Sequence, residues 1–212
     1  MKLYLVRHGV TVEYENQKSQ KPESPLSKEG IKQAKLLAQR IKRNGLKFDV
    51  VFASPFERAK KTAEIICKEL NFPFEETELL QERLKPAFIV GLGPGDSLYD
   101  KYFEELKKHW NDIDWKYNNE GESIADVLAR AQNFEKHLFE RHLNQDILVV
   151  SHGIFGRCFI ANCILGGNSN KDVFMNLFHA IKIENTGFSF LEYDEDDNRW
   201  KIHFLNDHSH LM

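Results

Sequence analysis

Two histidines in this 212-residue chain stand where an imidazole could contact a ligand. Each follows a short apolar run and precedes a glycine: residues 3–6 lead into Arg7-His8-Gly9, and residues 147–150 lead into Ser151-His152-Gly153. Runs this short and apolar are typical of buried strands, which would deliver polar side chains at their ends. An imidazole held in this way can act as a nucleophile or hold a substrate oxygen.

Arginine side chains define the chemistry further. Arg7 precedes His8, and Arg58 follows a third apolar run at residues 50–53. Guanidinium groups bind phosphate oxygens in bidentate fashion, and backbone amides at a helix start after Gly153 would add fixed dipoles. The pattern predicts a phosphoryl site in which these groups take the place of a metal ion.

Strands that alternate with helices must position these residues. Apolar residues at helical spacing predict helices that start after Ser27, at Ser54-Pro55-Phe56-Glu57, near Leu98, at Ser123 and at residue 154. The Ser54 start reads as a capping box with Pro55 at the first helical position, and Asn44-Gly45 ends the helix after Ser27. Further strands are predicted at 180–183, 187–193 and 200–205, the last two joined as a hairpin.

This order predicts an α/β fold with a three-layer α/β/α sandwich around a mostly parallel sheet. The chain is expected to form one domain over residues 1–212. In open sheets of this kind ligands bind outside the carboxyl ends of the strands, so Arg7, His8, Arg58 and His152 are expected to converge there. Residues 12–24 and 83–97 are expected to border the pocket, with Gly91 to Gly95 as a flexible lid.

The charge balance, the cysteine content and the length of the apolar runs argue against several classes of protein. The 29 basic and 32 acidic side chains give a net charge of -3, which provides no excess positive charge for nucleic acid or an acidic membrane. Three cysteines without metal spacing indicate reduced thiols and a cytoplasmic location. No apolar run reaches membrane-spanning length, and the N-terminal one is too short for a signal peptide.

Ordered motifs along almost the whole chain resemble the histidine phosphatase superfamily, which includes the cofactor-dependent phosphoglycerate mutases. They are Leu5-Val6-Arg7-His8-Gly9-Val10-Thr11, Pro25-Leu26-Ser27-Lys28-Glu29-Gly30 with Gln33-Ala34, Ser54 to Ala59 with Thr62-Ala63, Gly121-Glu122-Ser123, Val150-Ser151-His152-Gly153, Asn185-Thr186 and Asn206. The Arg-His-Gly triplet alone is weak evidence, but the ordered set is specific. The resemblance implies a phosphoglycerate mutase-like fold.

The resemblance also implies roles. His8 would attack phosphorus and form a phosphohistidine, while Arg7, Arg58 and His152, with the amides after Gly153, would hold the phosphoryl oxygens. A carboxylic acid must protonate the leaving oxygen and then activate water. Glu82 matches that position best, with Glu78 as the runner-up.

Two positions depart from the family pattern. Members often have Glu or Gln after Arg-His-Gly, and an Asn three residues after the Thr or Ser, where this chain has Val10 and Tyr14. Asn16 is a possible substitute for the missing phosphate contact. These departures, and the modest segment between Arg58 and Gly121, favour a phosphatase over a mutase.

The sequence therefore predicts a metal-independent phosphomonoester hydrolase that acts on a small phosphorylated metabolite. Three alternatives remain: a mutase-type phosphoryl transferase, a phosphohistidine-protein phosphatase and a non-catalytic phospholigand-binding module. We expect no cofactor and no metal, since His203, His208 and His210 lack a completing ligand pattern. Neither nucleic acid nor membrane is expected as a partner, and the oligomeric state and physiological substrate stay open.

Overall fold

A six-stranded sheet runs through the computed structural model, which describes residues 1–167 and 170–212. The strand order is β3-β2-β4-β1-β5-β6. The first four of these strands are parallel to one another. At one side of the sheet, β5 pairs in antiparallel fashion with both β1 and β6. The strands are β1 (Lys2–Arg7), β2 (Val50–Ala53), β3 (Glu75–Glu76), β4 (Asp146–Ser151), β5 (Phe188–Asp194) and β6 (Arg199–Asp207).

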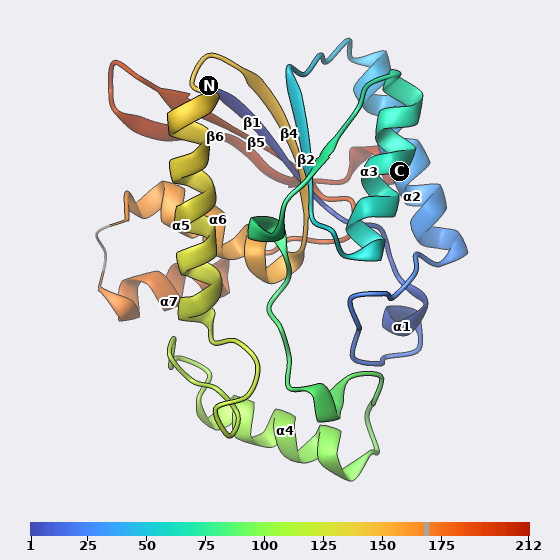
Figure 1. Cartoon of the computed structure of the whole chain (residues 1–212), viewed down its shortest axis with the longest axis vertical. Coiled ribbons are helices and arrows are strands. Elements are labelled where there is room, and N and C mark those ends of the chain that lie inside the picture. Colours follow the sequence, from blue (N-terminus) through green and yellow to red (C-terminus); the bar gives the residue numbers. More distant parts are fainter. Residues whose placement is uncertain (168–169) are drawn as a thin grey trace.

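Helices cover both faces of this sheet, as Figure 1 shows: α2 and α3 lie on one side, and α5 and α6 on the other. The helices are α1 (Val12–Glu15), α2 (Lys28–Arg43), α3 (Glu57–Leu70), α4 (Ser97–Lys108), α5 (Ile124–Arg141), α6 (Gly153–Leu165) and α7 (Lys171–Ala180), with 3-10 turns at Glu78–Leu80, Ala87–Ile89 and Ser209–Leu211. The predicted three-layer α/β/α fold with a mostly parallel sheet is confirmed.

Alternating side chains of the buried strands build a core on each face. On β1, Leu3 and Leu5 pack with the cluster that contains α5 and α6, whereas Tyr4 and Val6 pack with the cluster that contains α2 and α3. Burial on both faces explains why the strand reads as a continuous apolar run. It also leaves the polar residues after Val6 as the first that can face solvent or a ligand.

Two sequence predictions of local structure are wrong. No strand forms at 180–183, because Ala180 ends α7, a helix that the sequence analysis missed. Ser54 does not cap α3: the helix begins at Glu57 after Phe56, which makes no side-chain capping bond. The predicted hairpin of β5 and β6 and the Ser123 start of α5, a capping box with Asp126, are confirmed.

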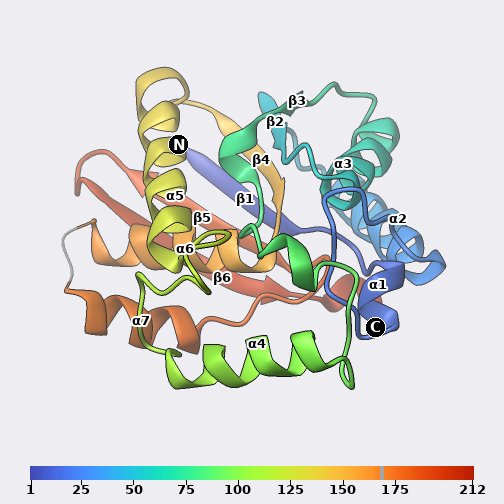
Figure 2. The same cartoon turned by 60° about the horizontal axis from the view of Figure 1, so that its bottom comes forward.

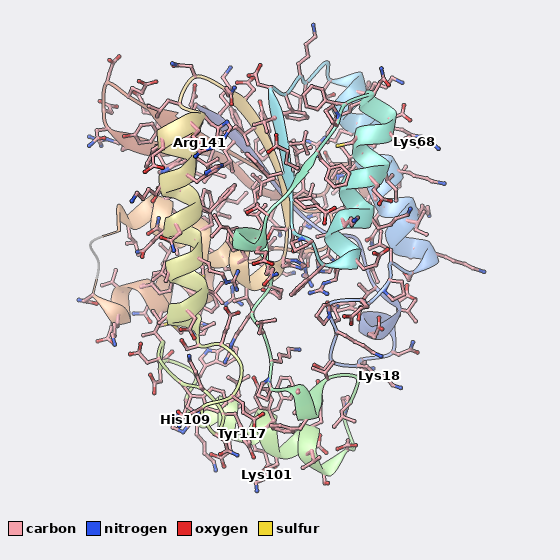
Figure 3. All side chains as sticks on the ribbon, in the orientation of Figure 1. Lys18, Lys68, Lys101, His109, Tyr117 and Arg141 are labelled. Carbon is pink, nitrogen blue, oxygen red and sulfur yellow. The ribbon has the colours of Figure 1, made fainter. Side chains whose placement is uncertain are left out.

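The segment between Arg83 and Glu122 leaves the sandwich and returns to it at one point. The Leu84 amide donates to the Glu122 carboxylate (2.8 Å), and the Glu122 amide donates to the Leu84 carbonyl (2.8 Å). Between these ends, α4 lies across the edge of the sandwich toward which the parallel strands point (Figure 2). Aromatic rings pack around the buried Tyr102, and the labelled His109 and Tyr117 belong to this separate group in Figure 3.

Among the described residues, no helix combines the length and the apolarity that are needed to cross a bilayer.

Candidate active site

A cavity of about 720 Å³ opens beyond the carboxyl ends of β1 and β2. It contains Arg7, Arg58 and Glu82, and His8 and His152 lie buried beside these residues. Its wall is formed by Arg7, Tyr14, Gln17, Lys18, Ser19, Gln20, Lys21, Pro22, Phe56, Arg58, Glu82, Arg83, Leu84, Lys85, Ala87, Val90, Pro94, Tyr99 and Ile154. The structure thus brings together the residues that the sequence analysis selected.

His8 is held in one tautomer. Its Nδ1 lies 2.7 Å from the carbonyl oxygen of Gly9, which can only accept, so Nδ1 carries the proton and Nε2 keeps its lone pair. Arg58 Nε donates to that Nε2 over 3.1 Å. Burial holds the pKa of His8 well below its usual value of 6.5, and the charges of Arg58 and Arg7 lower it further. A neutral imidazole with a free Nε2 is the form that a nucleophile requires.

Backbone contacts fix His8 from both sides. The Gly9 amide donates to Thr62 Oγ1 (3.1 Å), and that hydroxyl donates to the Arg58 carbonyl (2.7 Å), so one side chain joins the end of β1 to the first turns of α3. Asn185 Nδ2 donates to the His8 carbonyl (2.9 Å). The same small set of bonds therefore positions both His8 and Arg58.

Two guanidinium groups form the cationic side of the site. Arg58 is 3% exposed and donates from Nη1 to the Lys21 carbonyl (2.9 Å). Arg7 donates from Nη1 to the Ile183 carbonyl (2.9 Å), and its buried Nε has no partner among the described residues. Burial lowers the pKa of Arg7 and also that of Arg58, the latter to about 10, so Arg58 stays charged at neutral pH. Their remaining donors are available to an anion.

His152 completes the group at the start of α6. Its ring centroid lies 5.1 Å from that of His8, and its Nε2 lies 2.8 Å from Ser54 Oγ. Burial holds the pKa of His152 well below 6.5 as well, with Arg58 as the largest charge contribution. Ser54 therefore orients an imidazole of the site instead of capping α3. The sequence offered no signal for this contact, which spans 98 residues.

Glu82 lies at the N-terminus of α6. Its carboxylate accepts hydrogen bonds from the amides of Ile154 (3.1 Å), Phe155 (3.2 Å) and Arg83 (2.9 Å), and these three contacts fix the position of the side chain. Glu82 also lines the cavity. Glu78, the runner-up, is exposed in a 3-10 turn and does not line it.

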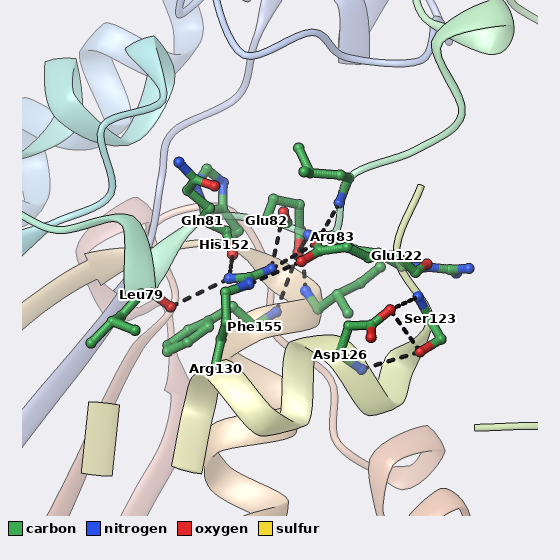
Figure 4. A network of polar contacts seen from close by, with 12 residues as sticks. Leu79, Gln81, Glu82, Arg83, Glu122, Ser123, Asp126, Arg130, His152 and Phe155 are labelled. Carbon is green, nitrogen blue, oxygen red and sulfur yellow. Dashed lines mark hydrogen bonds and ion pairs between the residues drawn. The ribbon is translucent and has the colours of Figure 1, made fainter. Parts of the chain in front are cut away.

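Arg130 of α5 holds the segment that carries Glu82 (Figure 4). Its guanidinium donates to the carbonyls of Gln81 (2.6 Å), Leu79 (3.3 Å) and Glu82 (3.4 Å), and it pairs with Glu122 (2.8 Å). Glu122 in turn accepts from Leu84. The sequence analysis missed Arg130, because the sequence does not distinguish it from a solvated arginine on the polar side of a helix.

Two loops cover the cavity. The Ser19 amide donates to the Leu92 carbonyl (2.7 Å), and the Gly91 amide donates to the Ser19 carbonyl (2.8 Å), so the loop after β1 and the predicted lid are joined. Tyr14 faces the cavity, with its ring centroid 5.8 Å from the Arg7 guanidinium. Asn16 is exposed, donates to the Val12 carbonyl and does not line the cavity. It therefore does not supply the missing phosphate contact in this structure.

Comparisons with known proteins agree with this geometry. The family model described as histidine phosphatase superfamily (branch 1) matches residues 3–208. The chain is 32% identical over 203 residues to phosphoserine phosphatase 1 of Hydrogenobacter thermophilus, covering 93% of this chain and 89% of that protein. It is 33% identical over 133 residues to a phosphoglycerate mutase of Schizosaccharomyces pombe, covering 60% of this chain and 62% of that one.

A solved structure shares the fold over the full length. It is a phosphoserine phosphatase of Entamoeba histolytica in complex with 3-phosphoglyceric acid, with a TM-score of 0.78 and 25% identity, covering 100% of this chain and 99% of that one.

Proposed function

The chain belongs to the histidine phosphatase superfamily (branch 1), and on that premise we propose that it hydrolyses small phosphomonoesters through a phosphohistidine at His8. The observation that carries the proposal is the tautomer of His8. Because Nδ1 is bonded to the Gly9 carbonyl, the lone pair of Nε2 lies on the side of Arg58. The phosphatase named among the relatives, 32% identical over 93% of this chain, supports hydrolysis.

In the first step His8 Nε2 attacks phosphorus, and the bond between phosphorus and the ester oxygen breaks. That oxygen takes a proton from Glu82 and leaves as an alcohol. Before the attack, Arg58 Nε must release Nε2, and it can then donate to a phosphoryl oxygen. Arg7 and Arg58 offset the charge on the phosphoryl oxygens, and His152 donates a hydrogen bond to one of them.

In the second step water attacks the phosphohistidine. Glu82 takes a proton from the water, the phosphorus–nitrogen bond breaks, and inorganic phosphate is released with His8 restored. The arginines and the amides at the start of α6 supply the positive charge that many phosphatases obtain from a metal ion. The proposed chemistry therefore needs no metal.

The direct test uses 4-nitrophenyl phosphate in the presence of a chelator. We expect turnover, with acid-labile phosphate on the protein after rapid quenching, and loss of both by at least about 10³-fold in His8→Ala. Absence of turnover, or turnover that persists in His8→Ala, would falsify the proposal.

Mutase-type transfer is the second candidate, because one relative at 33% identity is a phosphoglycerate mutase. Incubation with 3-phosphoglycerate distinguishes the two. Hydrolysis releases inorganic phosphate and glycerate, whereas transfer yields 2-phosphoglycerate.

We further propose a cytoplasmic location. The three cysteines are buried and form no disulfide, which fits a reducing compartment.

A further inference from the structure

The cavity is lined by more cationic side chains than the binding of one phosphoryl group requires. Six cationic side chains line it against a single carboxylate, Glu82. The cations are Arg7, Lys18, Lys21, Arg58, Arg83 and Lys85. Arg7 and Arg58 belong to the proposed phosphoryl site, and the other four have no role in the proposed reaction.

Three of these four are exposed or occupied. Lys18 and Lys21 are exposed residues of the loop after β1, and Figure 3 shows Lys18 on the side of that loop nearest the α4 segment. Arg83 donates from Nε to the Glu122 carbonyl (2.6 Å), and its guanidinium carbon lies 6.0 Å from the Trp115 ring centroid. Lys85 is the remaining cation.

The Lys85 ammonium is only partly satisfied. Nζ donates to the hydroxyl of the buried Ser19 (3.1 Å), and among the described residues no carboxylate lies within 4.0 Å of it. An ammonium group has three donors, so two remain for a ligand. Burial lowers the pKa of Lys85, the charge of Glu82 raises it, and Arg58 and Arg83 lower it further. A charge in this position is stabilised by an incoming anion.

We propose that Lys85 forms a second anion subsite, so that the preferred substrate is a small phosphomonoester carrying a further anionic group, a carboxylate or a second phosphate. This inference rests on the proposed function for the identity of the reacting phosphoryl group. Arg7 and Arg58 hold that group, and Lys85 binds the second anion under the loop that carries Ser19. The subsite selects by charge, since an ammonium is a point charge without a preferred plane.

Binding to the His8→Ala protein, which cannot turn the ligand over, tests the subsite. O-phosphoserine and O-phosphoethanolamine differ only by a carboxylate, and fructose 1,6-bisphosphate and fructose 6-phosphate differ by a phosphate. Calorimetry should give a Kd at least about 20-fold lower for the doubly anionic member of one pair or both. Which pair responds identifies the second anion.

Replacing Lys85 by Met in the same background should bring that Kd ratio to within about threefold, while Lys85→Arg should keep most of it. Ser19→Ala is the matched control, because it removes the contact to Nζ and leaves the charge; its ratio should stay close to that of the parent. A ratio near one in the parent, or a ratio that Lys85→Met leaves unchanged, overturns the subsite. These results do not depend on turnover, so failure of the phosphatase assay is recognised separately.

Discussion

At the scale of single residues, the bond from Arg58 to His8 has two effects. It keeps Nε2 unprotonated, because a guanidinium can only donate, and it occupies the lone pair that must attack phosphorus. A phosphoryl group that binds here gives Arg58 a charged hydrogen-bond acceptor in place of the neutral imidazole of His8. In the proposed mechanism, substrate binding therefore frees the lone pair of His8 and secures the phosphate in the same event.

The two buried imidazoles make stability depend on pH. The pKa values of His8 and His152 lie well below 6.5 in the folded protein. Below pH 6.5 the unfolded chain takes up protons that the folded state does not, so stability is lost as the pH falls, by about 1.4 kcal/mol per pH unit for each histidine. Urea unfolding in phosphate-free buffer should show that the total loss of unfolding free energy between pH 7.5 and 5.5 is about 1.4 kcal/mol smaller in His8→Gln than in the parent. Equal losses would contradict burial of a neutral His8.

The dependence of the rate on the leaving group can distinguish Glu82 from other carboxylates as the proton donor. Glu82→Gln should slow formation of the phosphoenzyme about 10²-fold or more for an alkyl phosphate, whose leaving oxygen needs a proton, and less than about 10-fold for 4-nitrophenyl phosphate. Rapid-quench measurement of protein-bound phosphate follows this step alone. Glu78→Gln, which alters an exposed carboxylate, is the matched control and should leave both rates within about twofold of the parent. Equal slowing of both substrates by Glu82→Gln would assign the proton to another group.

At the scale of elements, α5 positions the proposed catalytic side chain, which lies on another segment. Arg130 binds three carbonyls of the 79–82 segment, and Glu82 then reaches the amides of α6. Arg130→Met should therefore reduce phosphoenzyme formation from an alkyl phosphate about 30-fold, with a smaller effect on 4-nitrophenyl phosphate.

Lys136→Met on the same helix is the control, because Lys136 is exposed and pairs only with Glu140 at 3.8 Å. A purely structural role of Arg130 would lower the melting temperature and slow both substrates alike. That pattern would remove Arg130 from the positioning of Glu82.

Much of the element order was accessible from sequence, because buried strands and amphipathic helices leave different periods. The convergence of Arg7, Arg58 and His152 followed from one rule, that parallel strands end at the same edge of a sheet. The contact of Ser54 with His152 was not accessible, since a serine before a helix reads as a cap and only tertiary packing gives it another partner. Likewise, α7 was missed because a helix of 10 residues, with only Phe174, Met175 and Phe178 buried, presents a short apolar period.

At the scale of the whole molecule, access to the site depends on two segments that are far apart in sequence. The Ser19 and Gly91 amides bond across the gap between the loop after β1 and the lid. Residues of both segments form the wall of the cavity. We therefore expect ligand binding and release to require separation of the two loops.

Hydrogen exchange can detect this coupling. Orthovanadate, a mimic of the pentacoordinate transition state at phosphorus, should slow exchange of the Ser19 and Gly91 amides by about 10-fold or more, because we expect it to bind the arginines beneath the loops. The amides of β4 serve as the internal control and should not change. Unaltered exchange at Ser19 and Gly91 in saturating vanadate would show that the loops do not respond to the ligand.

Lys85 and Arg130 were beyond sequence reasoning for a common reason. Lys85 lies in a polar loop, and Arg130 lies on the polar face of a helix. Their partners, Ser19 and Glu122, are set by the path of the 84–122 segment. Charge patterns alone give such residues no distinction from solvated lysines and arginines. Glu82 was selected through its match to a family motif, and its bonds to α6 give that choice a physical context.

The paired bonds between Leu84 and Glu122 have an evolutionary consequence. They bring the ends of the 84–122 segment together on the sandwich. The intervening chain can therefore change in length or composition without moving the strands that hold the residues of the proposed site. Lengthening a loop whose ends are already joined costs little, about 0.6 kcal/mol for each doubling. Exchange of the segment between Leu84 and Glu122 can therefore change the range of substrates, while the residues of the proposed reaction stay in place.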